Sequence, residues 1–586
     1  MDFSTLSNYF SQIEPINSRL KMTEILASLL NKAYDNEIAQ MCYLGLGMLA
    51  PKFKGLELNM ADKMVIKVIA QVVNQPLSQI NTVYKQTGDL GETIFKLKKT
   101  TPIAQHKSVV QVYSDLLGVA LETGIGSQER KINRMVKLLH AVDNVSAKYI
   151  VRIILKKLRL GFSDMTVLDS LSWMVKKDKS LRPQLETAYN VRADIGQIAQ
   201  IFKRSGLNGI IQMVPETGTP IVPARATPLI DIVEIFDKMK GRPALEPKYD
   251  GFRVQIHMDK SKEFKLEKPD NLALFDQDKK GMVQIFSRNL DNITHMFPEL
   301  VKSALDLPIQ SGILDGEALA VDPKTGQFLD FQETVKRKRK HNIDKVQHEI
   351  PLKAYIFDLL YLNGKSLLAY PFLKRREFLQ QALDRPTGSL ELTPQVVIDN
   401  ELDFQKFFSQ VSKKGLEGLM AKKTDSIYKA GARDFTWVKY KVAMQAGMAD
   451  TVDAVVMGYF KGQGKWAKLG LGKVLVGIPE ADKILSLSKV GSGFSEDTIK
   501  EMLNRSKNLV INQQPDSYEV DKTLLPDVWL RPEMVVEIRA DSISRSPFYE
   551  TGLSLRFPRF VRFRDDKSPG DATSRRQLLQ MAHVIK

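Results

Sequence analysis

The sequence predicts a multidomain protein with an all-α N-terminal domain, a central α/β (α+β) domain and a C-terminal β-barrel. Apolar residues recur at helical spacing up to about residue 215. Alternation typical of strands begins near residue 243, and short strands separated by Gly-rich or polar turns follow residue 445. A chain of 586 residues is too long for one hydrophobic core. We place the domains at 1–215, 216–444 and 445–586.

The N-terminal segment is expected to carry a basic surface. Residues 96–160 contain 13 Lys/Arg against four acids, a net charge of +9. In "YIVRIILKKLRLG" an apolar stripe opposes Arg152, Lys156 and Arg159, and Gly161 marks the expected helix end. A solvated charged face would explain the same pattern. The concentration of charge, together with a net charge of +17 for the chain, favours a surface that binds a nucleic-acid backbone.

Composition excludes several classes of protein and site. No apolar run approaches membrane-spanning length, and the N-terminus lacks the pattern of a secretory signal. Cys42 is the only cysteine, which excludes internal disulfides and cysteine-based zinc sites. We therefore expect a cytoplasmic protein without a membrane partner. The stretch "MVPETGTPIVPARATPL" (213–229) is rich in Pro, Thr and Gly and is expected to be an extended linker.

The segment "KYDGFR" lies where the chain enters the predicted strand "FRVQIHM". A lysine is a good nucleophile only when its amine is neutral, and nearby cations such as a metal ion and Arg253 favour that form. The same cations offset the charge of an α-phosphoryl electrophile. Gly251 lets the backbone approach a ligand closely. The pattern predicts that Lys248 forms a covalent phosphoramidate; the alternative is a strand-edge turn with a surface ion pair.

"KYDGFR" resembles the adenylation motif of the covalent nucleotidyltransferases, which include ATP-dependent DNA ligases, RNA ligases and mRNA capping enzymes. Other segments follow in the family's order: "FSRNLDNIT", "LDGEA", "AYIFDLLYLNG", "EGLMAK", "WVKYK" and "RFPRFVRFRDDK". The helical N-terminal region resembles the DNA-binding domain of archaeal and eukaryotic replicative DNA ligases. The resemblance therefore implies an ATP-dependent DNA ligase with a nucleotidyltransferase domain and a C-terminal OB-fold. An RNA ligase or capping-type nucleotidyltransferase is the alternative, and a non-catalytic nucleic-acid-binding protein is a third.

The resemblance also implies roles for individual residues. Lys248 would become linked to AMP, with ATP as the donor and Mg²⁺ as the metal. The other implied contacts are Glu246 at adenine, Arg253 and Arg288 at the phosphate and sugar, Glu317 at the ribose or metal, Phe357 on the base, Glu417 at the metal, and Arg433, Lys439 and Lys441 at phosphates. Lys422 is expected on the opposite strand face from Glu417, without an assigned role.

The resemblance implies nicked double-stranded DNA as the main partner, bound in part by Arg152, Lys156 and Arg159, with a sliding clamp as a further partner. It implies a monomer that acts in DNA replication, repair and recombination in the cytoplasm of an archaeal-type cell, associated with the nucleoid. One departure from the family is the long polar segment between Arg253 and Arg288, which we expect to be a surface loop.

Overall fold

The computed structural model describes residues 1–99, 107–262, 281–329, 331–337, 347–385, 387–441, 451–462 and 469–584. Most of the predicted surface loop between Arg253 and Arg288 lies outside these ranges. The chain forms two compact units. The first comprises Met1–Thr227, Val233–Phe407 and Met420–Val438, and the second comprises Pro228–Ile232, Phe408–Leu419 and Lys439–Lys586. The expected order of a helical, an α/β and a strand-rich region is confirmed, whereas the boundaries at 215 and 444 stay predictions.

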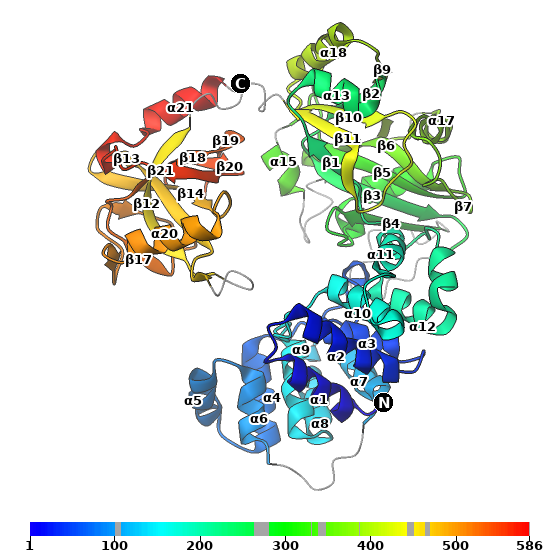
Figure 1. Ribbon diagram of the computed structural model, residues 1–586, viewed down its shortest axis with the longest axis vertical. Coiled ribbons are helices and arrows are strands. Elements are labelled where there is room, and N and C mark those ends of the chain that lie inside the picture. Colours follow the sequence, from blue (N-terminus) through cyan, green and yellow to red (C-terminus); the bar gives the residue numbers. More distant parts are fainter. Residues whose placement is uncertain are drawn as a thin grey trace. The chain divides into compact units, whose positions relative to one another are not determined.

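The N-terminal part of the first unit is a bundle of helices (Figure 1). In α4 the buried residues Val65, Val68 and Val72 recur at three- or four-residue spacing, as an amphipathic helix requires. The apolar core of the helical bundle is formed by residues between Phe3 and Ile210. The helices are α1 (Phe3–Ile13), α2 (Arg19–Lys32), α3 (Ile38–Gly45), α4 (Asp62–Val73), α5 (Leu77–Thr87), α6 (Leu90–Leu97), α7 (Val109–Leu121), α8 (Ser127–His140), α9 (Asn144–Ile154), α10 (Asp164–Lys176), α11 (Arg182–Val191) and α12 (Ile195–Ile211).

The segment 213–229 is not the extended linker that its composition predicts. Ile221 is fully buried, and its backbone exchanges two hydrogen bonds with the Gln255 side chain, of 2.8 and 3.1 Å. The Gly218 amide donates to His257 Nδ1 at 3.1 Å. Burial lowers the pKa of His257 to about 3, so the ring stays neutral and can accept. The content of Pro, Thr and Gly led us to expect an extended linker. The long-range contacts instead hold this segment against the central sheet.

The central region contains two sheets. One has the order β4-β3-β5-β6-β7, with β8 also paired to β6, and the other has the order β1-β11-β10-β2-β9. The strands are β1 (Arg225–Pro228), β2 (Pro243–Lys248), β3 (Phe252–Asp259), β4 (Met282–Ser287), β5 (Ser311–Ala320), β6 (Leu352–Leu362), β7 (Lys365–Ser366), β8 (Leu390–Leu392), β9 (Val396–Val397), β10 (Gly418–Lys423) and β11 (Arg433–Lys441). The accompanying helices are α13 (Ile232–Met239), α14 (Pro298–Leu305), α15 (Phe331–Lys336), α17 (Phe372–Ala382) and α18 (Glu401–Lys413).

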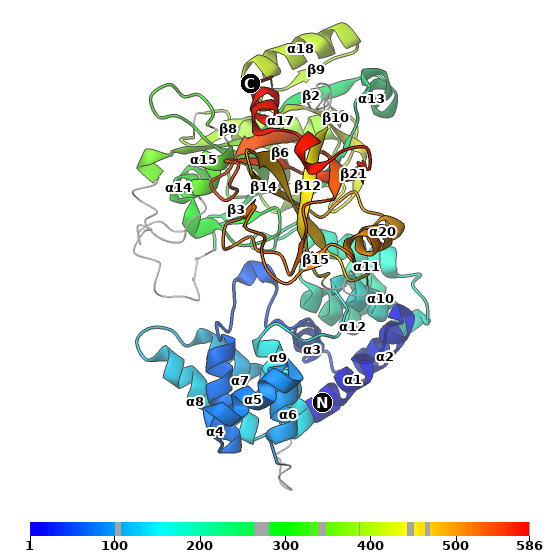
Figure 2. The same ribbon diagram turned by 90° about the vertical axis from the view of Figure 1, so that its left-hand side faces the viewer.

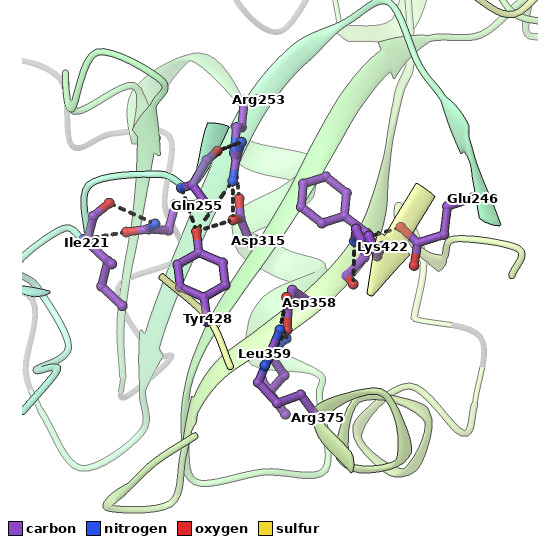
Figure 3. A network of polar contacts seen from close by, with 12 residues as sticks. Ile221, Glu246, Arg253, Gln255, Asp315, Asp358, Leu359, Arg375, Lys422 and Tyr428 are labelled. Atoms are coloured by element: carbon purple, nitrogen blue, oxygen red, sulfur yellow. Dashed lines mark hydrogen bonds and ion pairs between the residues drawn. The ribbon is translucent and has the colours of Figure 1, made fainter. Parts of the chain in front are cut away.

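The larger sheet is buried on both faces. On one face, Val254, Ile256 and their neighbours form a core with residues of α14 and α17, such as Leu300 and Leu379. On the other face lies a smaller core. Ile313 and Leu360 come to it from the larger sheet, Trp437 comes from the smaller sheet, and Ile221 and Tyr428 come from the segments before β1 and between β10 and β11. Figure 3 shows polar side chains beside this second core, including the predicted nucleotide-contacting residues Glu246 and Arg253.

The second unit contains the strand-rich C-terminal region. Strand β12 pairs antiparallel with β13, β17 and β18, and bulges interrupt several of the pairings. Bulges bend and twist a sheet, which suits a small barrel. Helices α20 and α21 lie outside the strands (Figures 1 and 2) and add Ile499 and Leu578 to their core. The elements are β12 (Val452–Phe460), β13 (Lys473–Glu480), β14 (Lys483–Val490), α20 (Glu496–Ser506), β15 (Val510–Ile511), β16 (Tyr518–Glu519), β17 (Val528–Leu530), β18 (Val535–Arg539), β19 (Ser542–Arg545), β20 (Leu553–Arg556), β21 (Arg559–Phe563) and α21 (Arg575–Val584). Among the described residues, no helix is long and apolar enough to span a membrane.

Candidate active site

Lys248 is the last residue of β2, and a short turn leads from it into β3. Its side chain is half-buried, with Nζ 3.4 Å from the Tyr249 carbonyl oxygen. Tyr249 is buried and stacks on Tyr355 at a centroid distance of 4.6 Å, which anchors the turn. A Cβ on Gly251 would lie 2.3 Å from the Ala318 carbonyl oxygen. Only glycine therefore allows the turn to approach β5 this closely.

Glu317 lies on β5, directly opposite Arg253 in the β3–β5 pairing. Burial raises the pKa of Glu317 to about 7, and the positive charges of Lys248 and Arg253 act in the opposite direction. The carboxyl group is thus near its midpoint at neutral pH. Any further cation beside it would favour the ionised form.

The described residues contain no group of three or more His, Cys, Asp or Glu side chains that could hold a metal ion. This does not conflict with a Mg²⁺ requirement, because Mg²⁺ commonly takes one or two carboxylates and completes its shell with water and substrate phosphates. Glu317 fits such a ligand, because it is half-buried and the charges of Lys248 and Arg253 only partly offset the lost hydration of its carboxylate.

Arg253 forms a network that joins β3, β5 and the segment before β1 (Figure 3). Its Nε and Nη2 donate to the two carboxylate oxygens of Asp315 at 2.9 and 2.5 Å, and Nη1 donates to the Ala224 carbonyl at 2.9 Å. The Tyr428 hydroxyl donates to Asp315 at 3.0 Å. All three guanidinium nitrogens have protein acceptors, so the geometry favours a positioning role for Arg253 over the direct nucleotide contact that the resemblance implies.

Phe357 is half-buried on β6 and presents its ring between the two sheets. The Trp437 ring meets it edge-on at a centroid distance of 5.8 Å, and Lys422 Nζ lies 4.5 Å from the Phe357 centroid. Glu246, on β2, is almost completely buried and pairs with Lys422 at 2.7 Å. The structure therefore brings Glu246 and Phe357 together through Lys422, whose role the sequence left open.

The remaining predicted residues lie on or next to strands β4, β10 and β11. Arg288 follows β4 and Arg433 begins β11, and both are exposed. Lys439 is half-buried further along β11. In the second unit, Lys441 Nζ lies 2.5 Å from Glu417 Oε1. The Glu417 carboxylate is thus neutralised by a lysine, and a metal ion would have to compete with that ion pair.

Comparison with known proteins decides the family. Three protein-family models match the chain. The family "ATP dependent DNA ligase domain" matches residues 274–441, "DNA ligase N terminus" matches residues 2–172, and "ATP dependent DNA ligase C terminal region" matches residues 467–567. The "Probable DNA ligase" of Dictyoglomus turgidum is 38% identical over 99% of this chain and 97% of its own length. The "DNA ligase" of Staphylothermus marinus is 37% identical, over 99% and 98%. The chain belongs to the ATP-dependent DNA ligases.

The solved structure named "Pmar-Lig_PreS3" covers 95% of the ligase and 99% of its own chain, with a TM-score of 0.53 and 18% identity, which supports the fold alone. Membership of the family confirms the predicted enzyme class, ATP as the AMP donor and nicked DNA as the partner. Mg²⁺ is typical of the family. The RNA ligase and capping-enzyme alternative is not favoured.

Arg152 is wrongly placed by the helical pattern, which puts it on an exposed basic face of the ligase. It is 3% exposed. Its Nη1 lies 2.9 Å from Glu14, at the end of α1, and its Nη2 lies 3.1 Å from Asp89, which caps α6. The polar face of α9 is covered by α1 and α6, so Arg152 serves a buried ion-pair network rather than a DNA surface.

Lys156 and Arg159 are exposed, but they lie in a loop rather than on a helix. Helix α9 ends at Ile154, not at Gly161. Lys156 adopts φ 54° and Arg159 φ 60°, and the Lys157 amide donates to the Arg152 carbonyl. This is a left-handed helix end in which lysine takes the position that glycine usually occupies. The sequence therefore contains no glycine to indicate that the helix ends here. Both side chains form ion pairs, Lys156 with Glu57 at 2.8 Å and Arg159 with Asp89 at 3.2 Å, so each would have to exchange this partner for a DNA phosphate.

The exposed loop of Lys156 and Arg159 and the buried site of Arg152 predict different effects of substitution, the first on DNA binding and the second on stability. Lys156→Ala with Arg159→Ala should lower the slope of log affinity for nicked DNA against log salt by about 2, because roughly one counterion is released per phosphate contact. Arg152→Met should leave that slope unchanged and lower the free energy of unfolding by about 3 kcal/mol, because Glu14 and Asp89 lose their most buried cationic partner and keep Lys148 and Arg159 beside them. Salt-dependent binding and urea unfolding measure the two effects.

Lys177 provides a matched control for the loop residues, because it is also exposed and left-handed, with φ 60°, at the end of α10. Lys177→Ala should not alter the salt slope. An unchanged slope in the Lys156/Arg159 double variant would show that these residues do not contact DNA phosphates.

Proposed function

We propose that this ligase carries AMP on Lys248 and seals nicks in duplex DNA by three phosphoryl-group transfers. The observation that supports this most is the position of Lys248. It is at the end of β2, half-buried, and its charge acts on the Glu317 carboxylate across a turn that only glycine allows. Attack on an α-phosphorus requires a nucleophile held close to a carboxylate that can bind a metal ion.

In the first transfer, Lys248 Nζ releases its proton to solvent and attacks the α-phosphorus of ATP. The N–P bond forms and pyrophosphate leaves with its bridging oxygen. In the second, a 5′-phosphate oxygen at the nick attacks the AMP phosphorus, the N–P bond breaks, and Lys248 takes up a proton. In the third, the 3′-hydroxyl attacks the 5′-phosphate, loses its proton and displaces AMP. A bound Mg²⁺ supplies charge neutralisation at the phosphoryl oxygens, and Glu317 is the residue that would hold it.

The other residues receive roles that follow from where they lie. Glu246 and Phe357 contact the base, and Arg253 positions β5. Arg288, Arg433, Lys439 and Lys441 contact phosphates. Glu417 is a second residue that would hold a metal ion, if phosphates drew Lys441 away from it. The resemblance to replicative ligases supports three further proposals: that the enzyme acts as a monomer, that it acts in the cytoplasm at the nucleoid, and that a sliding clamp recruits it. Separate apolar cores in the three parts of the chain support the proposed domain boundaries.

A pulse–chase assay tests the proposal. The protein is adenylated with ATP labelled at the α-phosphate, freed of nucleotide, and mixed with nicked DNA or an equivalent nicked RNA duplex. We expect each labelled protein to seal at most one DNA nick and release one labelled AMP, with little transfer to RNA. Sealing of many nicks per protein without added ATP would contradict a stoichiometric enzyme–AMP carrier.

A further inference from the structure

The turn that follows Lys248 connects the two sheets of the central region. Strand β2 ends at Lys248 and belongs to the smaller sheet, whereas β3 begins at Phe252 and belongs to the larger sheet. The proposed nucleophile therefore comes from one sheet, and Glu317, on β5, comes from the other. Their relative position depends on how firmly the turn is held, and a displacement of about 1 Å between reacting groups can lower a rate about 10²-fold.

The ring of Tyr249 anchors the turn to the larger sheet. Tyr249 is 6% exposed, and its ring stacks on that of Tyr355 with a centroid distance of 4.6 Å and an interplanar angle of 22°. Tyr355 lies on β6, directly opposite Glu317 in the β5–β6 pairing. The stack therefore ties the residue next to the nucleophile to the strand neighbour of the proposed metal ligand.

Phe328 completes a cluster of three rings. Its centroid lies 6.0 Å from that of Tyr249 and 5.6 Å from that of Tyr355, and both contacts are edge-on. Phe328 is half-buried and lies on the hairpin after β5, where it forms a β-bridge with Val321. Stacked and edge-on arrangements are the ones that aromatic pairs favour. We call Tyr249, Phe328 and Tyr355 the turn cluster; its rings come from three segments of the central region.

The two ends of the turn are held in different ways. At the end next to β3, the backbone of Gly251 lies so close to β5 that a Cβ there would be 2.3 Å from the Ala318 carbonyl oxygen. At the end next to Lys248, the turn is held by the Tyr249 ring. Loss of the ring contacts should therefore displace Lys248 while the contact of Gly251 with β5 remains.

We propose that Tyr355 and Phe328 are positioning residues that hold Lys248 in place through the ring of Tyr249. This inference rests on the proposed role of Lys248 as the AMP carrier. The turn cluster sets the rates of the two transfers in which a bond between Lys248 and phosphorus forms or breaks. It does not set the rate of the third transfer, in which the 3′-hydroxyl displaces AMP from DNA and no bond to Lys248 changes.

Tyr355→Leu tests the proposal, because leucine removes the stacked ring but keeps an apolar side chain. Adduct formation at saturating ATP should slow about 10²-fold, because the nucleophile is displaced. KM for ATP should change by less than about threefold, and so should the rate of sealing nicked DNA that already carries AMP on its 5′-phosphate. Tyr355→Phe keeps the ring and should restore most of the lost rate. Single-turnover rates with α-labelled ATP and with the adenylated DNA measure these effects.

Phe328→Leu keeps the test decisive if Tyr355→Leu does not fold, because Phe328 is half-buried on a hairpin and the stacked pair remains. Adduct formation should slow about tenfold in this variant, again without a change in sealing of adenylated DNA. Phe378→Leu is the matched control. Phe378, on α17, meets Tyr370 edge-on at 5.8 Å and packs against the core that contains Leu300. Its loss should leave the ratio of the two rates at the wild-type value.

The outcomes separate this inference from the proposed function. Wild-type rates of adduct formation in the leucine variants at positions 355 and 328 would overturn the inference. Equal losses in adduct formation and in sealing of adenylated DNA would also overturn it, because they would show that the rings only maintain the fold. Failure of the wild-type protein to form an AMP adduct would overturn the proposed function itself.

Discussion

Lys248→Ala should abolish the covalent AMP adduct while leaving affinity for nicked DNA within about twofold of the wild type. Alanine lacks the side-chain nitrogen that is proposed to bond to the α-phosphorus. Lys156 and Arg159, the expected DNA contacts, lie in the N-terminal helical part of the chain, so the substitution at position 248 should leave them unchanged. Incorporation of label from α-labelled ATP measures the adduct, and salt-dependent binding measures the DNA contacts.

Two control experiments show whether the loss of the adduct is specific to the nucleophile. Lys248→Arg keeps a positive charge but replaces the amine with a guanidinium that stays protonated, and it should also fail to form the adduct. DNA that already carries AMP on its 5′-phosphate bypasses the first two transfers, so both variants should still seal it. An adduct that survives in Lys248→Ala would refute the assignment.

Glu317→Gln should reduce self-adenylation by about 10²–10³-fold, comparable to the loss of one preorganised charge-stabilising group. The substitution should also remove the pH dependence of self-adenylation that the ionisation of Glu317 causes in the wild type. Burial raises the pKa of Glu317 from 4.5 to about 7, so in the wild type the ionised form, and with it activity, increases as pH rises through about 7. Higher Mg²⁺ should move that midpoint to lower pH, because the metal binds the ionised carboxylate. Initial rates of adduct formation between pH 6 and 8 measure both effects.

The same pKa shift predicts a stability effect of defined sign. Because the folded-state pKa of Glu317 is raised, its contribution to stability is complete below about pH 4.5 and is lost as pH rises through about 7. Glu317→Gln carries no charge at any pH. Without Mg²⁺ it should therefore be more stable than the wild type above pH 7, by up to about 3 kcal/mol, and similar near pH 4.5. Glu377→Gln, at an exposed ion pair on α17, is the matched control. A Glu317→Gln variant with wild-type activity and pH profile would exclude Glu317 from the site.

The order of helical and strand regions, and the turn that carries Lys248, could be predicted from local pattern. Periodicity indicates which face of a helix is apolar, and the spacing of "KYDGFR" combines a nucleophile with a glycine that must approach another strand. The pairing of Glu246 with Lys422 could not be predicted in this way. It joins β2 to β10 through a contact between residues far apart in sequence, and neither residue type specifies its partner.

Arg152 shows why helical periodicity misled. The pattern correctly separates Arg152 from the apolar stripe of α9, but it cannot reveal that α1 and α6 cover the polar face with Glu14 and Asp89. Lys156 shows a second limit. Glycine is the usual signal for a left-handed helix end, so a lysine in that conformation gives no warning. In both cases tertiary contacts override the local signal.

Transfer of AMP through Lys248 is tested most directly by peptide mapping with mass spectrometry of the wild-type protein after incubation with ATP and Mg²⁺. We expect a single AMP adduct on the peptide that contains Lys248, with the fragment ions placing it on that side chain. Pyrophosphate should remove it and regenerate ATP, and nicked DNA should remove it and be sealed. An AMP group found on another residue, or sealing by protein whose Lys248 is never modified, would contradict transfer through Lys248.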